Sequence, residues 1–214
     1  MTEPLATREA RLDPAHTAVL VIDMQHDFCA EDGYVERVVG RSTAACRDLV
    51  APLSAFLASA RAVGVPVIWV RAIYDPERLP PGIRAKQLQN GPQVCCGTGS
   101  AGAEFFGVAP TEGELVADKH SYSAFVGTEL GDRLRAMGLR SLVFTGVQTN
   151  VCVETSLRDA VCEGFYAAIA SDCVASHAPA LHDATLANVG ALFGDVLPAA
   201  EMISAWQAAR RSAT

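Results

Sequence analysis

Residues 141–173, SLVFTGVQTNVCVETSLRDAVCEGFYAAIASDC, decide the fold of this chain. The apolar, β-rich run at residues 142–145 indicates a buried strand. Thr149 and Asn150, residue types that favour helix N-caps, then precede residues 151–163, whose apolar spacing predicts an amphipathic helix. The stretch therefore predicts one strand–helix unit of an α/β protein.

Cys152 falls in the first turn of this predicted helix, just beyond the end of the strand. Free N–H groups and the positive end of the helix dipole favour a thiolate at such a position. A free cysteine is also a common small hydrophobic residue of protein cores. Position alone leaves both a nucleophile and a buried core thiol open.

Strands and helices alternate on both sides of this unit. The predicted strands are 17–23, 67–71, 114–119, 142–145, 165–170 and 195–197. The predicted helices are 41–63, 128–137, 151–163, 179–193 and 199–211. We expect loops at 24–40 and in the Pro- and Gly-rich section 72–113, whose length indicates a functional loop. The alternation predicts one three-layer α/β domain over residues 1–214, with a parallel sheet and a tail at 1–14.

The composition excludes several classes of protein. Half of the residues are hydrophobic and 19% are charged, which is typical of a globular chain rather than a disordered one. A net charge of −7 provides no basic footprint for nucleic acid or an anionic membrane surface. No apolar run has the length of a membrane span, and the polar start MTEPLATREARLDPAH lacks the apolar region of a signal peptide. We therefore expect a cytoplasmic protein with reduced thiols.

The cysteines do not predict a metal site. The chain has seven, with no framework-like spacing. The adjacent pair Cys95 and Cys96 has neither the CxxC spacing nor the neighbouring histidine of a zinc site. We predict no metal here, and the role of the pair stays open.

Three motifs in order carry a family resemblance: LVIDMQHDF, DKHSYSAF and GVQTNVCVETSLRDA. From about residue 17 to about residue 206 the chain resembles the isochorismatase-like cysteine hydrolases. It is closest to the amidohydrolase branch with ureidoacrylate, biuret and N-carbamoylsarcosine hydrolases. The resemblance implies a six-stranded, mainly parallel sheet of order 3-2-1-4-5-6, with a ligand crevice where strands 1 and 4 meet.

The resemblance also implies a catalytic triad of Asp23, Lys119 and Cys152. Cys152 attacks an amide or ureido carbonyl, Lys119 stabilises the thiolate, and Asp23 moves the proton. Singly, Asp23 suits a turn cap and Lys119 suits a solvated charge, but their convergence at strand ends favours the triad. The N–H groups of Gln148 and Cys152 are the implied oxyanion hole, presented by a cis peptide between Val147 and Gln148 rather than an ordinary trans turn.

The candidate substrate contacts are a glutamine two residues past Asp23 and aromatic residues near the crevice. They are Gln25, Phe28, Trp69, Tyr122 and Phe125. Each aromatic residue suits the core equally well, and the glutamine amide suits loop stabilisation. Histidines provide an alternative base, although none falls in a motif that places it against Cys152. They are His26, His120, His177 and His182.

The expected function is a cysteine-dependent amidohydrolase that releases ammonia from a small ureido, carbamoyl or primary amide compound through a thioester. Nicotinamide-cleaving relatives carry an Asp-x-His metal motif after the second strand, where this chain reads VRAIYDPE, so we expect no metal or other cofactor. The resemblance implies a homodimer or homotetramer. The alternatives are an isochorismatase-type vinyl-ether hydrolase, which needs no thiol, and a non-catalytic or thiol-regulated binding protein on the same fold.

Overall fold

The computed structural model describes residues 3–212, apart from the side chain of Ser212, and contains a six-stranded sheet of order β3-β2-β1-β4-β5-β6. Every neighbouring pair of strands is parallel. The strands are β1 (Thr17–Ile22), β2 (Val67–Ala72), β3 (Leu115–Lys119), β4 (Ser141–Val147), β5 (Tyr166–Ala175) and β6 (Gly194–Leu197). The predicted fold class and the strand order implied by the resemblance are confirmed.

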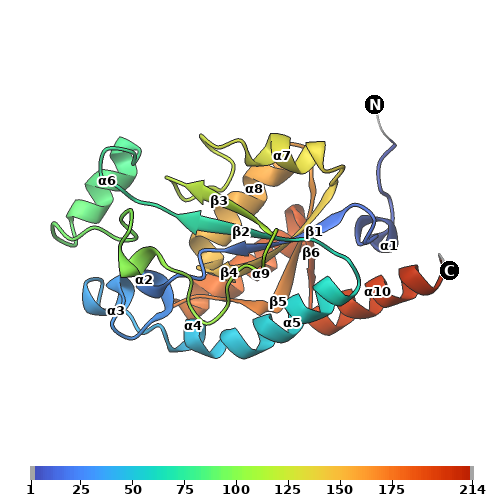
Figure 1. Cartoon of the computed structure of the whole chain (residues 1–214), viewed down its shortest axis with the longest axis horizontal. Helices are drawn as coiled ribbons and strands as arrows, with labels where there is room; N and C mark the ends of the chain where they lie inside the picture. The colour runs from blue at the N-terminus through green and yellow to red at the C-terminus, as the bar shows by residue number, and fades with distance from the viewer. Residues whose placement is uncertain (1–2, 213–214) are drawn as a thin grey trace.

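Helices cover both faces of the sheet, which gives three layers (Figure 1). α5 (Val50–Ala62) and α10 (Ala199–Ser212) pack on one face, and α7 (Leu130–Ala136), α8 (Glu154–Cys162) and α9 (Pro179–Leu192) pack on the other. The central strand β1 is buried along its whole length, as its continuous apolar run predicts for a strand covered on both faces.

Alternate residues of β1 enter opposite core layers. Val19 and Val21 face α5 and α10, where the rings of Phe56 and Trp206 stack 5.4 Å apart. Leu20 and its even-numbered neighbours face α7 and α8. Side chains alternate with a period of two along any strand, so the residue number decides which layer a side chain enters.

The predicted loops contain short helices. Residues 24–40 include α2 (His26–Cys29) and α3 (Tyr34–Arg37), and the section 72–113 includes α6 (Pro81–Leu88) and the 3₁₀ turn η1 (Ala101–Ala103). The predicted helix 41–63 divides into α4 (Ala44–Asp48) and α5. The sequence pattern did not predict α2, α3 and η1 because they are too short to show an apolar period, nor α6, which buries no residue and so has no apolar face.

The N-terminal segment packs against its own sheet instead of forming a free tail. Residues 8–11 form α1 (Arg8–Arg11), and Arg11 Nε donates a hydrogen bond to Asp195 Oδ2 at 3.0 Å. The Leu5 N–H donates to the Tyr166 hydroxyl at 2.8 Å. Residues 1 and 2 of the predicted tail lie outside the described residues. Among the described helices, none combines the length and apolar character needed to cross a membrane.

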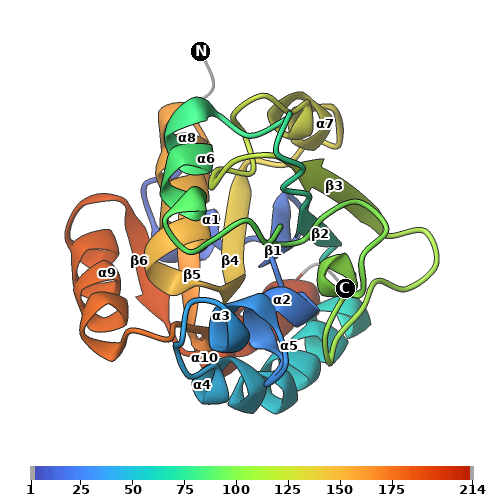
Figure 2. The same ribbon diagram turned by 90° about the vertical axis from the view of Figure 1, so that its left-hand side faces the viewer.

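The carboxyl ends of the strands point toward α2, α3 and α6 (Figure 1). Figure 2 looks onto this side of the molecule, with these three helices in front of the sheet. Asp23 directly follows β1, Lys119 is the last residue of β3, and Cys152 lies in the π-helical turn η2 (Thr149–Val153) after β4. The topology therefore places all three predicted catalytic side chains at the same end of the sheet.

Candidate active site

The three predicted catalytic residues converge through the Lys119 ammonium. Lys119 Nζ lies 3.0 Å from Asp23 Oδ2 and 3.4 Å from Cys152 Sγ. The exposed fractions are 1% for Asp23, 0% for Lys119 and 5% for Cys152. The predicted close approach of Lys119 to the sulfur is confirmed, and the ammonium lies between a carboxylate and a thiol in a water-poor site.

Tyr74 and Ser121 complete the surroundings of the ammonium. Lys119 Nζ donates to the Tyr74 hydroxyl at 3.0 Å and to the Ser121 carbonyl at 2.8 Å. The Tyr74 hydroxyl also lies 3.1 Å from the Ser121 carbonyl and 3.7 Å from Cys152 Sγ. An ammonium has three protons, and three oxygens lie nearer to it than the sulfur does. Its effect on the sulfur is therefore mainly that of a nearby positive charge.

The enclosed site disfavours the thiolate form of Cys152. Burial and the negative charge of Asp23 raise the pKa of the Cys152 thiol to about 12, although Lys119 acts in the opposite direction. Lys119 thus acts on the thiol in the direction that the sequence predicts, but burial and Asp23 outweigh it. Desolvation destabilises any charged form, and this penalty exceeds the attraction of one cation that also pairs with a carboxylate.

Asp23 and Lys119 perturb each other in the same enclosed site. Burial raises the pKa of Asp23, and the attraction of the Lys119 charge offsets only part of that rise. Burial by itself lowers the pKa of Lys119, but the charges of Asp23 and Cys152 outweigh it and raise the net pKa. Lys119 therefore stays cationic, while Asp23 is a more basic carboxylate than usual and suits proton transfer.

The turn before Cys152 has an unusual backbone. The peptide between Val147 and Gln148 is cis, as predicted. Gly146 adopts a φ of 96°, and a Cβ atom at this position would lie 2.1 Å from the Ile22 carbonyl oxygen. Only glycine permits this close approach of β4 to β1 next to the site.

Gln148 is the N-cap residue of the turn η2, in place of the predicted Thr149 and Asn150. Thr149 Oγ1 instead lies 2.9 Å from His182 Nδ1, and Asn150 Oδ1 accepts a hydrogen bond from Ser176 at 2.6 Å. Both polar side chains thus tie the turn to the neighbouring segment 176–182. Sequence alone favours a local capping bond because it does not show these long-range partners.

A pocket of about 150 Å³ opens onto the sulfur. Two of the predicted substrate contacts, Phe28 and Tyr122, line it together with the predicted triad residues Asp23 and Cys152. The other lining residues are Tyr34, Val35, Val39, Tyr74, Gln87, Asn90, Cys95, Val147, Gln148, Val151 and His177. A larger open hollow of about 850 Å³ lies at the opposite ends of β2 and β3, away from the triad.

Three predicted substrate contacts lie outside this pocket. The Gln25 amide is fully buried and donates to the carbonyls of Ala72 and Ala103, both at 2.9 Å, so it holds the loop after β1. Trp69 points into the core beneath α5, and its indole N–H donates to Glu114 Oε2 at 2.7 Å.

Phe125 is also a core residue. Its ring lies 6.1 Å from that of Phe165, and both belong to the core layer beneath α7 and α8. The structure therefore places Gln25, Trp69 and Phe125 outside the pocket where the sequence predicted substrate contacts. Proximity to a strand end in the sequence does not show which face of the sheet a side chain enters.

No histidine among the described residues hydrogen-bonds to Cys152, so a Cys–His arrangement finds no geometric support. His177 lines the pocket, where burial and the Arg41 charge lower its pKa. The ring of His26 contacts Phe106 edge-on at 5.2 Å, and His120 Nδ1 lies 2.7 Å from the Ile73 carbonyl. Asp23, which lines the pocket together with Cys152, stays the predicted base.

Sequence reasoning missed Tyr74, the residue that joins the ammonium to the sulfur. One indication was available, because Tyr74 follows strand β2 by two residues and the carboxyl end of β2 lies beside the site. The sequence could not indicate the Ser121 carbonyl, because every residue has a backbone carbonyl.

The fold and the buried Asp–Lys–Cys arrangement define a class of cysteine hydrolase with a doubly wound α/β architecture. The isochorismatase domain family matches residues 17–201, and the chain belongs to this family. It is 33% identical to the ureidoacrylate amidohydrolase RutB of Methylobacterium radiotolerans over 95% of this chain and 82% of that protein. It is 32% identical to RutB of Agrobacterium fabrum over 91% of both chains.

Two solved structures share the fold and some sequence. A cysteine hydrolase from Pseudomonas syringae pv. phaseolicola is similar with a TM-score of 0.83 and 28% identity, covering 98% of this chain and 100% of that one. The N-carbamoylsarcosine amidase of Thermoplasma acidophilum is similar with a TM-score of 0.70 and 27% identity, covering 86% and 95%. These relatives confirm the resemblance to the amidohydrolase branch.

Proposed function

We propose that this chain is a cysteine-dependent amidohydrolase that releases ammonia from a small ureido, carbamoyl or primary amide compound. The observation that carries the proposal is the position of the buried Lys119, in contact with both Asp23 and Cys152, two residues that line the pocket. The relatives named as amidohydrolases cleave carbon–nitrogen bonds, and the chain is a hydrolase of this type.

In the first step, Cys152 Sγ attacks the carbonyl carbon of the substrate. The thiol proton passes to Asp23 as the carbon–sulfur bond forms, because the raised thiol pKa requires a base at that moment. Lys119 stabilises the negative charge that develops on the sulfur. The N–H groups of Gln148 and Cys152 are the proposed donors to the oxygen of the tetrahedral intermediate.

In the second step, the carbon–nitrogen bond breaks and Asp23 returns its proton to the leaving nitrogen, which departs as ammonia. A primary amide leaves a thioester on Cys152, and a ureido compound leaves the corresponding thiocarbamate. Water then attacks this carbonyl, Asp23 accepts the proton of the water, and the proton returns to the sulfur. The sum is one water consumed and one ammonia released, with the enzyme regenerated.

The dimensions of the pocket support a small substrate. Its volume of about 150 Å³ lies below the roughly 300–1,000 Å³ that is typical of sites for drug-sized ligands. Phe28 and Tyr122 provide apolar walls, and Asn90 and Gln87 provide amide groups near the entrance. We therefore propose that the reacting carbonyl of the substrate lies between the rings of Phe28 and Tyr122.

The proposed enzyme is a cytoplasmic homodimer or homotetramer of single-domain subunits that span residues 1–214. The exposed apolar side chains Leu181 and Leu192 on α9, with exposed fractions of 54% and 74%, support buried contact with a second copy. Light scattering over a range of protein concentrations tests the assembly. A particle of 22.5 kDa at every concentration would contradict it.

The function is tested by an ammonia-release assay on a panel of ureido compounds, carbamoyl amino acids and primary amides. The Cys152→Ala variant is the control for contaminating activity. We expect turnover of at least one panel member by the wild-type protein and loss of at least 1,000-fold in the variant, because the variant lacks the sulfur that attacks the carbonyl. Retention of more than a tenth of wild-type kcat would rule out the covalent route.

A further inference from the structure

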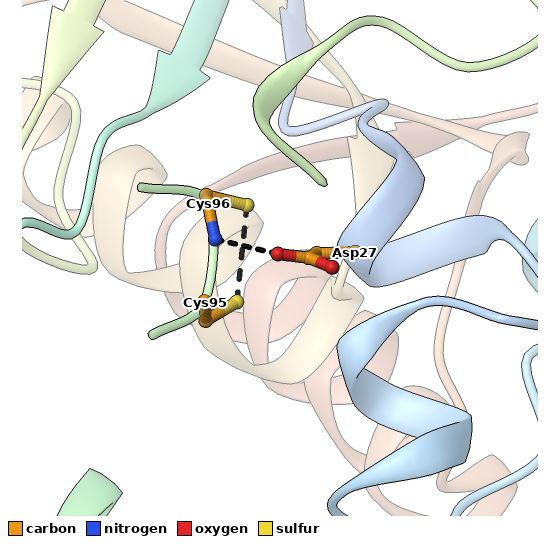
Figure 3. Close-up of side chains that lie close together, drawn as sticks. All are labelled: Asp27, Cys95 and Cys96. Carbon is orange, nitrogen blue, oxygen red and sulfur yellow. Dashed lines mark hydrogen bonds between the residues drawn. The ribbon is translucent and has the colours of Figure 1, made fainter. Parts of the chain in front are cut away.

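A second group of reactive side chains lies next to the catalytic pocket and takes no part in the proposed reaction. Asp27 of α2 and the adjacent Cys95 and Cys96 of the section 72–113 are all buried, and one ligand atom from each lies within 4.8 Å of the others. Figure 3 shows both sulfurs on the side of the chain that faces the carboxylate. Two sulfurs and one carboxylate thus border one small space.

The spacing of the two sulfurs suits a shared tetrahedral ion. Cys95 Sγ and Cys96 Sγ lie 3.8 Å apart. Two thiolates bound to one zinc ion at about 2.3 Å, at the tetrahedral angle, have sulfurs about 3.8 Å apart. The observed spacing therefore requires no opening or closing of the pair to accept such an ion.

The third ligand is held in place by the backbone. Asp27 Oδ2 accepts a hydrogen bond from the Cys96 N–H at 2.6 Å, and Oδ1 accepts one from the Tyr34 N–H at 3.1 Å. Cys96 has a φ of 50°, a left-handed conformation uncommon for a residue other than glycine. Each carboxylate oxygen keeps a second lone pair for a metal, and hydrogen bonds of this kind orient metal ligands.

The charge of the cluster also suits a divalent cation. In the protonated state Cys95 Sγ donates to Cys96 Sγ, and Cys96 Sγ donates to the Gly102 carbonyl at 3.5 Å. When a divalent ion binds and two protons leave, the cluster keeps the net charge of −1 that Asp27 alone provides.

We propose that Asp27, Cys95 and Cys96 form a binding site for a thiophilic divalent ion, with Zn²⁺ the ion of matching geometry. Cys95 also lines the catalytic pocket, so the pocket provides an entry path and a water molecule for the fourth position. The ion joins α2 to the section 72–113 and stabilises one wall of the pocket. This inference revises the sequence-based prediction of no metal, and it does not depend on the proposed reaction.

The proposal is tested by metal binding to the reduced, chelator-treated full-length protein. We expect one equivalent of Co²⁺ to produce a thiolate-to-metal charge-transfer band, and one equivalent of Zn²⁺ to displace it. Cys95→Ser and Cys96→Ser should each weaken metal binding at least tenfold. Substitutions of residues that only support a metal's ligands already lower the metal affinity about 10- to 100-fold. Cys162→Ser, an exposed thiol, and Cys152→Ala, in the same pocket, are the matched controls and should bind like wild type.

A second measurement decides the question if the serine variants do not fold. X-ray absorption of the wild-type protein with one equivalent of Zn²⁺ should show two sulfur ligands at about 2.3 Å together with oxygen ligands. A zinc ion bound without sulfur, or no stoichiometric binding, would overturn the proposal. So would binding that survives both serine variants and disappears in Cys46→Ser, because the site would then be the neighbouring buried pair Cys29 and Cys46.

Discussion

Lys119 Nζ lies 3.0 Å from Asp23 Oδ2, and neither side chain has more than 1% of its surface exposed. Two opposite charges that are buried together stabilise each other, whereas either charge buried alone has an uncompensated desolvation penalty. The two residues that the proposed reaction uses therefore also stabilise the folded site. Both charges that the proposed reaction uses are held in place by each other.

The first prediction concerns the coupling between these two residues. Lys119→Met and Asp23→Asn should each lower the free energy of unfolding by roughly 3–5 kcal/mol, since each leaves one buried charge without its partner. The double variant should lose clearly less than the sum of the single losses while remaining inactive. Urea unfolding followed by circular dichroism measures the three values. Additive losses would show that the two residues act independently.

The second prediction concerns the protonation of Cys152. With a thiol pKa of about 12, the rate of iodoacetamide labelling at Cys152 should rise about tenfold for each pH unit between about pH 7 and about pH 10. Mass spectrometry of the peptide that contains Cys152 separates it from the exposed Cys162. A reference peptide with a free thiol should level off near its pKa of about 8.5. A plateau for Cys152 below about pH 9 would mean that the resting site holds a thiolate.

The third prediction concerns Tyr74, a proposed positioning residue. Tyr74→Phe removes the hydroxyl that accepts a hydrogen bond from Lys119 at 3.0 Å and keeps the ring that shapes the pocket. A hydrogen bond to a charged group contributes about 1.5–3 kcal/mol, so kcat should fall roughly 10- to 100-fold while KM stays within about threefold. Tyr34→Phe removes a hydroxyl from the same pocket without touching Lys119, and it should keep kcat within about threefold of wild type. Equal losses in both variants would assign the effect to the pocket in general.

The fourth prediction concerns Trp69 as a structural residue. Partial burial by itself raises the pKa of Glu114, but hydrogen bonds from Arg61, the Thr111 N–H and the Trp69 indole outweigh it and lower the pKa to about 2. This folded-state pKa lies below the ordinary 4.5, so the stabilisation is complete above pH 4.5 and is lost as the pH falls toward 2.

Trp69→Phe should therefore destabilise the fold by about 1 kcal/mol at neutral pH and lessen the acid sensitivity contributed by Glu114 between pH 4.5 and pH 2. KM should not change, because Trp69 lies outside the pocket. Thermal unfolding between pH 7 and pH 3 and a kinetic comparison with wild type test both parts. A large rise in KM with unchanged stability would show instead that Trp69 contacts the substrate.

The sequence predicted the inner strands β1, β2 and β4 because their apolar runs are buried on both faces and need no knowledge of their neighbours. The edge strands β3 and β6 are partly exposed, and the alternation with helices indicated them. β5 is the exception, since it continues to Ala175 past the polar Asp172, where the apolar run ends. Asp172 Oδ1 accepts a hydrogen bond from the Ala199 N–H at 2.7 Å. The extra length depends on this long-range contact and on pairing with β4, and neither is visible in the sequence.

The positions of Asp23, Lys119 and Cys152 followed from the sequence because parallel strands bring their carboxyl ends to one edge. Of the predicted substrate contacts, Phe28 and Tyr122 line the pocket, whereas Trp69 and Phe125 lie in the core. Trp69 lies in β2 opposite Val21, well before the strand end, and its position in the strand turns it toward α5. An aromatic residue suits either environment, so residue type does not separate the two cases.

The sequence by itself determined the α/β class, the family and the three residues of the candidate active site, because these depend on local periodicity and on motifs in chain order. Only the tertiary structure decided that burial raises the pKa of the Cys152 thiol and that the Tyr74 hydroxyl contacts both this sulfur and Lys119. The tertiary structure alone also brought Asp27 to Cys96, 69 residues away. A pKa and a ligand cluster depend on desolvation and on distances between atoms from remote segments, and these quantities exist only once the chain has folded.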